Sequence, residues 1–265
     1  MDNVTSGSKQ GAALQSNPTN PSPSSAQTGL GTATQSGMSV NNGDTLDIAA
    51  GVSSSNVTVN AGGVVTVSGG TLTTATVSGG EVDVFSGGTV SAANVTNGGN
   101  LYVEDGASAV SASVGSAGYL EVDAGGVASG TQVGSAGIVQ LAGTGVASGT
   151  TLGSSATLYA GSGTTAVGTV VQDGASLQVQ QGGVASGTLQ QGGTTTIFAG
   201  ASATDTTVNG GALNLVEGST VTNTTVAGSG SFTVASGTTA RNTTVNAGGL
   251  ATVSGGTLTT ATVSG

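Results

Sequence analysis

Apolar residues recur along most of the chain at a nearly constant spacing, each close before a glycine-containing stretch. This first column runs from Val40 to Val263 in twelve intervals and consists of Val40, Val59, Val77, Val95, Val114, Val133, Leu152, Val171, Leu189, Val208, Val226, Val245 and Val263. A fixed period of roughly 18 or 19 residues is typical of repeat proteins, in which each period forms one structural unit.

One segment of the chain returns almost unchanged. Residues 58–79 read TVNAGGVVTVSGGTLTTATVSG, and residues 244–265 read TVNAGGLATVSGGTLTTATVSG. The two segments differ at two positions, and the second begins ten periods after the first. The repeat therefore runs without interruption between them.

Each period holds two further apolar columns. The second column is a pair of residues separated by one position: Leu46/Ile48, Val65/Val67, Val82/Val84, Leu101/Val103, Leu120/Val122, Val139/Leu141, Leu158/Ala160, Leu177/Val179, Thr195/Ile197, Leu213/Leu215, Phe232/Val234 and Ala251/Val253. The third column is less regular: Val52, Leu72, Val90, Val110, Val127, Val146, Val184, Val221 and Leu258, with Ala203 and Ala240 as weaker members. Alternation over such short stretches predicts short β-strands and not helices.

Three short strands per period, separated by glycine corners, predict an all-β parallel β-helix. We expect about 12 coils of 18–19 residues, stacked about 4.8 Å apart. Glycine suits the corners because it adopts a positive φ at little cost. The repeat domain covers residues 39–265. Residues 1–38 are rich in Ser, Asn and Gly, contain all three prolines and predict a flexible leader or linker.

The amino-acid composition argues against most kinds of enzyme active site. The 265 residues include no His and no Cys, only two basic residues and twelve acidic ones, for a net charge of −10. Imidazole bases, thiolate nucleophiles and zinc sites are therefore excluded, and nucleic acid would be repelled. We expect no enzyme activity, no metal and no cofactor. No apolar run approaches the length that spans a bilayer, and no signal peptide is visible at the N-terminus.

The outward residue between each second-column pair is the best candidate for an adhesive face. Its members with carboxylate, amide or phenol groups are Asp47, Asp83, Tyr102, Glu121, Gln140, Tyr159 and Gln178. Such a stacked column could bind a glycan, a host surface or another copy of the chain, while strand propensity and solvation alone would also select these residue types. A carbohydrate-active β-helix enzyme that uses Glu81, Asp83, Glu104, Glu121 or Asp123 is the alternative from a different class.

Segments such as ATDTTVNGG (203–211), VTNTTVAGSG (221–230) and ARNTTVNAGG (240–249) resemble the repeats of AIDA-type self-associating autotransporter adhesins, the group that includes antigen 43 and TibA. The resemblance implies a right-handed β-helix passenger that is secreted or displayed on the bacterial surface. It also implies cell–cell aggregation, adhesion and biofilm formation, with self-association between copies on neighbouring cells. The signal peptide and translocator barrel of that family are not visible in this chain.

The same resemblance implies O-linked heptose on Ser or Thr, added by a dedicated heptosyltransferase. The corner hydroxyls that precede glycine are then the candidate acceptors: Ser68, Ser78, Ser86, Ser254 and Ser264. Serine before glycine is also ordinary turn chemistry. A further alternative is that the chain serves chiefly as the acceptor substrate of the glycosyltransferase.

Overall fold

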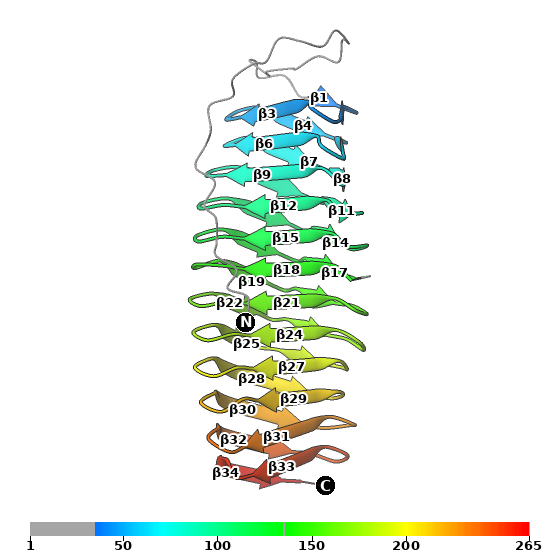
Figure 1. Cartoon of the computed structure of the whole chain (residues 1–265). Helices are drawn as coiled ribbons and strands as arrows, with labels where there is room; N and C mark the ends of the chain where they lie inside the picture. Colours follow the sequence, from blue (N-terminus) through cyan, green and yellow to red (C-terminus); the bar gives the residue numbers. More distant parts are fainter. Residues whose placement is uncertain (1–34, 135, 265) are drawn as a thin grey trace.

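The computed structural model describes residues 35–134 and 136–264. These residues form 12 stacked coils of a parallel β-solenoid, and each coil has three sides (Figure 1). In Figure 1 the strands nearest the viewer run to the left while the chain descends from its N-terminal to its C-terminal coil, so the solenoid is right-handed. The predicted fold class is confirmed.

Face A is the 12-stranded sheet turned towards the viewer in Figure 1. Its strands contain the second apolar column: β3 (Thr45–Ala49), β6 (Val64–Ser68), β9 (Glu81–Phe85), β12 (Asn100–Val103), β15 (Tyr119–Val122), β18 (Ile138–Leu141), β21 (Thr157–Ala160), β24 (Ser176–Val179), β27 (Thr194–Ile197), β29 (Ala212–Leu215), β31 (Ser231–Ala235) and β33 (Leu250–Ser254). We number the coils 1 to 12 by these strands.

Faces B and C together make up the 22-stranded sheet. Face B follows face A along the chain and contains β1 (Gln35–Ser36), β4 (Ser53–Ser55), β7 (Thr71–Thr73), β10 (Thr89–Ser91), β13 (Ser108–Val110), β16 (Val127–Ser129), β19 (Val146–Ser148), β22 (Thr165–Val167) and β25 (Val184–Ser186). Face C contains β2 (Ser39–Val40), β5 (Thr58–Asn60), β8 (Thr76–Ser78), β11 (Asn94–Thr96), β14 (Ser113–Val114), β17 (Gln132–Val133), β20 (Thr151–Leu152), β23 (Val170–Val171) and β26 (Leu189–Gln190). In the last coils the two faces share one strand: β28 (Ser202–Val208), β30 (Thr220–Val226), β32 (Thr239–Val245) and β34 (Thr257–Val263).

Strand pairing begins at Gln35, which pairs with Ser54. Residues 1–34, which make up most of the predicted leader 1–38, lie outside the described residues. The N-terminal residues in which no signal peptide is visible belong to that part.

One corner of every coil, between faces B and C, is a single residue in the left-handed region. Its φ lies between 51° and 67° in all 12 coils: Asn56, Thr74, Ala92, Ser111, Gly130, Gly149, Gly168, Gly187, Asp205, Asn223, Asn242 and Thr260. Glycine, asparagine and aspartate tolerate this conformation best, and they occupy eight of these positions. Other glycines are fixed by close stacking: a Cβ at Gly126 would overlap the carbonyl oxygen of Val103 in the coil before it.

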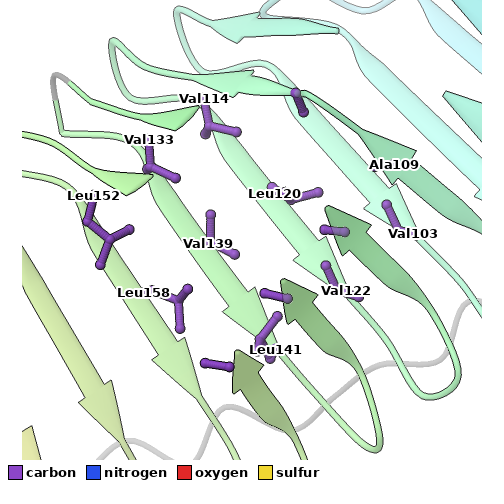
Figure 2. Close-up of a cluster of buried hydrophobic side chains, with 14 of the residues drawn as sticks. Val103, Ala109, Val114, Leu120, Val122, Val133, Val139, Leu141, Leu152 and Leu158 are labelled. Atoms are coloured by element: carbon purple, nitrogen blue, oxygen red, sulfur yellow. The ribbon is translucent and has the colours of Figure 1, made fainter. Parts of the chain in front are cut away.

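The core consists of aliphatic ladders that run along the interior. Figure 2 shows Leu120, Val139 and Leu158 of face A stacked in successive coils, opposite Ala109 of face B. Strand pairing keeps the second column in register from Leu46 to Ala251, and the column is confirmed as buried except in the last coil, where Val253 has 48% of its surface exposed. Each fully buried Val or Leu contributes about 1.5–3 kcal/mol.

The first column is correct except at Leu189. Leu189 pairs with the outward Val170, and the neighbouring Gln190 pairs with Val171 and points into the core. Both positions satisfy the period, because the chain shortens by one residue in this region. The prediction that the aliphatic Leu189 is the inward residue of this coil is therefore wrong.

The third column is wrong at Val110, Val127, Val146 and Val184. These valines face outward, and the inward ladder is formed mostly by the alanines beside them: Ser54, Leu72, Val90, Ala109, Ala128, Ala147, Ala166, Ala185, Ala203, Val221, Ala240 and Leu258. Val52 is buried as well, but it lies before the strand, whose inward residue is Ser54. The valines were favoured for their hydrophobicity, although the strand presents only its alternate residues to the core.

The interior also contains a polar ladder. In seven successive coils the first inward residue after the left-handed corner is a threonine with at most 1% of its surface exposed: Thr131, Thr150, Thr169, Thr188, Thr206, Thr224 and Thr243. Their Oγ1 atoms have no hydrogen-bond partner among the described residues. Buried hydroxyls without a partner lower stability, so this ladder weakens the core that surrounds it.

Candidate adhesive surface

The candidate residues on face A form one continuous outward column. Strand pairing places Asp47, Thr66, Asp83, Tyr102, Glu121, Gln140, Tyr159 and Gln178 side by side in eight successive coils. The column continues through Thr196, Asn214, Thr233 and Thr252 to the last coil. The structure thus brings together the residues that the sequence singled out, on a face about 53 Å long.

A second outward column on face A adds a tyrosine that the sequence analysis missed. Tyr119 lies two residues before Glu121, so both side chains leave the same side of β15. The Tyr119 hydroxyl donates a hydrogen bond of 3.0 Å to Oε2 of Glu121. Its ring meets the Tyr102 ring edge-on, with centroids 6.2 Å apart and planes at 65°. The same period-2 rule that selected Glu121 also identifies Tyr119.

Carboxylates gather around these two rings. Burial raises the pKa of Glu121, the hydrogen bond from Tyr119 opposes that rise, and the charge of Asp123 adds to it. Burial, followed by the charges of Asp123 and Glu121, likewise raises the pKa of Glu104. The carboxylates of Glu104, Glu121 and Asp123 therefore gather on coils 4 and 5, whereas Arg241, the one basic side chain in the described ranges, lies on face B of coil 11.

The tyrosines respond to the same charges. Burial, together with the charge of Glu121 and the hydrogen bond to it, raises the pKa of Tyr119. Burial and the charges of Glu81, Glu121 and Asp83 raise the pKa of Tyr102. Both phenols stay protonated at neutral pH, so Tyr119 keeps its hydrogen bond to Glu121 and Tyr102 can donate a hydrogen bond to a ligand.

The predicted acceptor serines lie on two different corners. Ser68, Ser86 and Ser254 are exposed at the corner between faces A and B. Ser78 and Ser264 lie at the corner between faces C and A, where each has an asparagine partner from a neighbouring coil. Asn97 Nδ2 donates to Ser78 Oγ at 3.0 Å, and Ser264 Oγ donates to Asn246 Oδ1 at 2.9 Å.

Comparison with known proteins gives one clear relationship. No family model and no curated protein matches the chain. Among solved structures, the chain matches the crystal structure of a TibC-catalysed hyper-glycosylated fragment of TibA, with a TM-score of 0.68 and 30% sequence identity. The match covers 88% of this chain and 99% of the TibA fragment. The chain belongs to the AIDA-type autotransporter adhesins, the family of TibA.

Across residues 35–134 and 136–264, no three His, Cys, Asp or Glu side chains are grouped so that they could hold a metal ion. Within the same ranges there is no helix with the length and hydrophobicity to cross a bilayer. The outward columns of face A are the candidate adhesive surface.

Proposed function

We propose that the chain is the adhesive rod of a bacterial surface protein, without catalytic activity, that holds cells to one another and to surfaces in aggregates and biofilms. The observation that carries the proposal is the 30% identity to a TibA fragment over 88% of the chain. A solenoid suits this role because each coil contacts only its neighbours, so that length and outward chemistry can vary independently of the core.

Adhesion by such a rod rests on many weak contacts. A single hydrogen bond at a wet interface contributes about 1 kcal/mol, yet a column of 12 coils repeats the contact along its whole length. On face A we propose Asp47, Asp83, Tyr102, Glu121, Gln140, Tyr159 and Gln178 as contact residues. Amide, carboxylate and phenol groups in one line fit a glycan or a polar host surface, and neighbouring copies of the rod are the second class of partner.

We propose that a TibC-like heptosyltransferase modifies the chain on corner hydroxyls. The support is that the related TibA fragment is hyper-glycosylated through TibC. Ser68, Ser86 and Ser254 are the preferred acceptors because they are exposed, at the corner between faces A and B. Ser78 and Ser264 are less favoured as acceptors, since the hydroxyl of each is hydrogen-bonded to an asparagine.

The test is display of the chain on the surface of cells that do not aggregate by themselves. We expect the cells to clump and settle, and we expect the intact mass of the purified chain to increase by whole heptose units when TibC is co-expressed. The control is a chain with Ser68, Ser86 and Ser254 replaced by alanine, which should gain fewer units. Cells that stay dispersed would exclude the adhesive function, and an unchanged mass would exclude the modification.

A further inference from the structure

The valines that the third column wrongly assigned to the core form a patch on the outside of face B. The valine patch consists of Val110, Val127, Val146, Val167 and Val184, one in each of coils 4 to 8. Val110, Val127 and Val167 have 38–39% of their surface exposed. The patch continues onto face C through Val170 and Leu189, which pair with each other and are partly exposed. Val146 and Val184 are partly exposed, so outward valines follow one another through five successive coils and mark a candidate contact surface.

The strand residues beside the valine patch on face B carry no charge. The residues that pair with its members on neighbouring coils are serines and threonines, such as Ser108 beside Val127 and Ser186 beside Val167. Among the described outward residues on the strands of face B, the only charges are Arg241 and, at the corner of the shared strand β28, Asp205. The net charge of the chain is −10, and face A has carboxylates in its outward columns. Two copies therefore repel each other less when they approach through face B than when they approach through face A.

The place of the patch along the rod suits a contact between identical molecules. Coils 4 to 8 are centred on Val146 in coil 6 of 12, close to the middle of the rod. A two-fold axis at Val146 would set coil 4 of one copy against coil 8 of the other and coil 5 against coil 7. The two valine patches would then lie over the same five coils, with Val146 opposite its own copy and the other valines offset from one another, and nearly the whole length of the two rods would overlap.

The area of face B limits which partners could cover the valine patch. Five coils of three-residue strands give roughly 240 Å² for the patch itself, well below the roughly 800 Å² per partner of a stable complex. Face B over all 12 coils gives roughly 600 Å², which a partner covers only if it is as long as the rod. A second copy of this chain has that length.

We propose that the valine patch is the contact through which two copies of the rod associate side by side, face B to face B. The proposal rests on the adhesive function proposed above and assigns its self-association to a defined surface. The Ser and Thr columns around the patch supply hydrogen bonds at the rim, and the valines supply the apolar centre. The estimated area fits a reversible contact that becomes strong when many rods act together.

The experiment compares the purified, unglycosylated chain with a variant carrying Val127→Ser and Val167→Ser. The matched control carries Ile138→Ser and Val216→Ser, because these residues have 37% and 38% exposure but lie on face A and on the corner after β29. Sedimentation velocity measures the dissociation constant, and small-angle X-ray scattering measures the longest dimension of the associated form. Thermal unfolding verifies that all three proteins are equally folded.

We expect the Val127→Ser, Val167→Ser variant to associate roughly ten-fold more weakly or worse, since a two-fold contact loses each valine twice. The control should associate like the parent chain, and the dimer should be no longer than one rod. Three results would overturn the proposal that the valine patch is the contact. The variant could associate as strongly as the parent, the control could be weakened as much as the variant, or the dimer could be twice as long as one rod. A parent chain that neither associates nor clumps cells would instead refute the proposed function.

Discussion

Gln190 pairs with Val171 of the preceding coil, and both side chains point into the core. The amide Nε2 of Gln190 donates to the carbonyl oxygen of Gly193 at 3.2 Å, whereas its Oε1 has no partner among the described residues. The Gly193 carbonyl also accepts the N–H of Ala212, so it remains bonded without the glutamine. One amide thus interrupts an otherwise aliphatic ladder and leaves one polar atom unsatisfied.

Gln190→Leu should stabilise the solenoid by about 1 kcal/mol, because leucine has a similar volume and removes the unsatisfied oxygen. Thermal unfolding followed by circular dichroism measures the change. Leu152→Gln is the matched reverse substitution two coils earlier in the same column and should lower stability by roughly 2–4 kcal/mol. A lower midpoint for Gln190→Leu would mean that the amide is satisfied in solution.

The buried threonine ladder gives a second prediction. Replacing Thr150 and Thr169 by valine keeps the branched shape and removes two hydroxyls that have no partner, so we expect a gain of about 1–2 kcal/mol in all. The control exchanges Thr151 and Thr165, which point outward, for valine and should change stability by less than about 0.5 kcal/mol. Equal effects of the two pairs in the same unfolding experiment would contradict the assigned inward orientation.

The corner between faces B and C is held by stacked polar groups near the C-terminal end. Asn223 Nδ2 donates to Asp205 Oδ1 at 2.9 Å, and Asn242 Nδ2 donates to Asn223 Oδ1 at 3.1 Å. Asn223→Ala should cost about 1–2 kcal/mol, since it removes both bonds and places a less tolerant residue at a φ of 56°. Asn223→Gly loses the same bonds but fits the conformation, so its smaller loss, measured by urea unfolding, isolates the backbone contribution.

The acidic surface around Glu121 predicts a stability that increases as the pH falls. The pKa of Glu121 is raised in the folded chain, so its charged form destabilises the fold above that pKa and the cost disappears below the ordinary value of 4.5. The unfolding midpoint should therefore rise between pH 7 and pH 4.5. Glu121→Gln should reduce this dependence, and Tyr119→Phe should increase it because it removes the hydrogen bond that opposes the shift.

The control for this pH effect is Glu217→Gln. It removes one charge beyond β29, five coils from Glu121, and so separates the local effect from the general loss of negative charge. The midpoint of each variant is measured across the same pH range. A Glu121→Gln variant that keeps the full dependence of the parent would contradict the assignment to this carboxylate.

The errors of the sequence analysis all concern which of two adjacent residues points inward. In the third column the misassigned valines are unevenly spaced, because the step from Val90 to Val110 is longer than the step from Val110 to Val127. The true inward residues, from Val90 through Ala109 to Ala128, are separated by two equal steps. Even spacing was therefore the signal that could have identified the alanines.

At Leu189 no such signal existed. The first column passes from Val171 to Val208 in two steps of unequal length. The shorter step is the first one if the column passes through Leu189 and the second one if it passes through Gln190, and both orders fit the repeat. The left-handed residue Gly187 decides between them, because it interrupts the alternation of the strand and makes Thr188 and Gln190 the inward residues. Local conformation at the corner, and not hydrophobicity, sets the phase of the next face.

The sequence by itself determined the period, the three-sided coil and the outward column of face A, because a short, constant repeat with alternating strands allows few other folds. Only the tertiary structure decided which side of each face B strand meets the core, and with it that Val110, Val127, Val146 and Val184 lie outside. The physical reason is the size of the interior. Where faces B and C meet in coils 4 to 8, the inward positions hold alanine and threonine, and the larger valines beside them face the solvent.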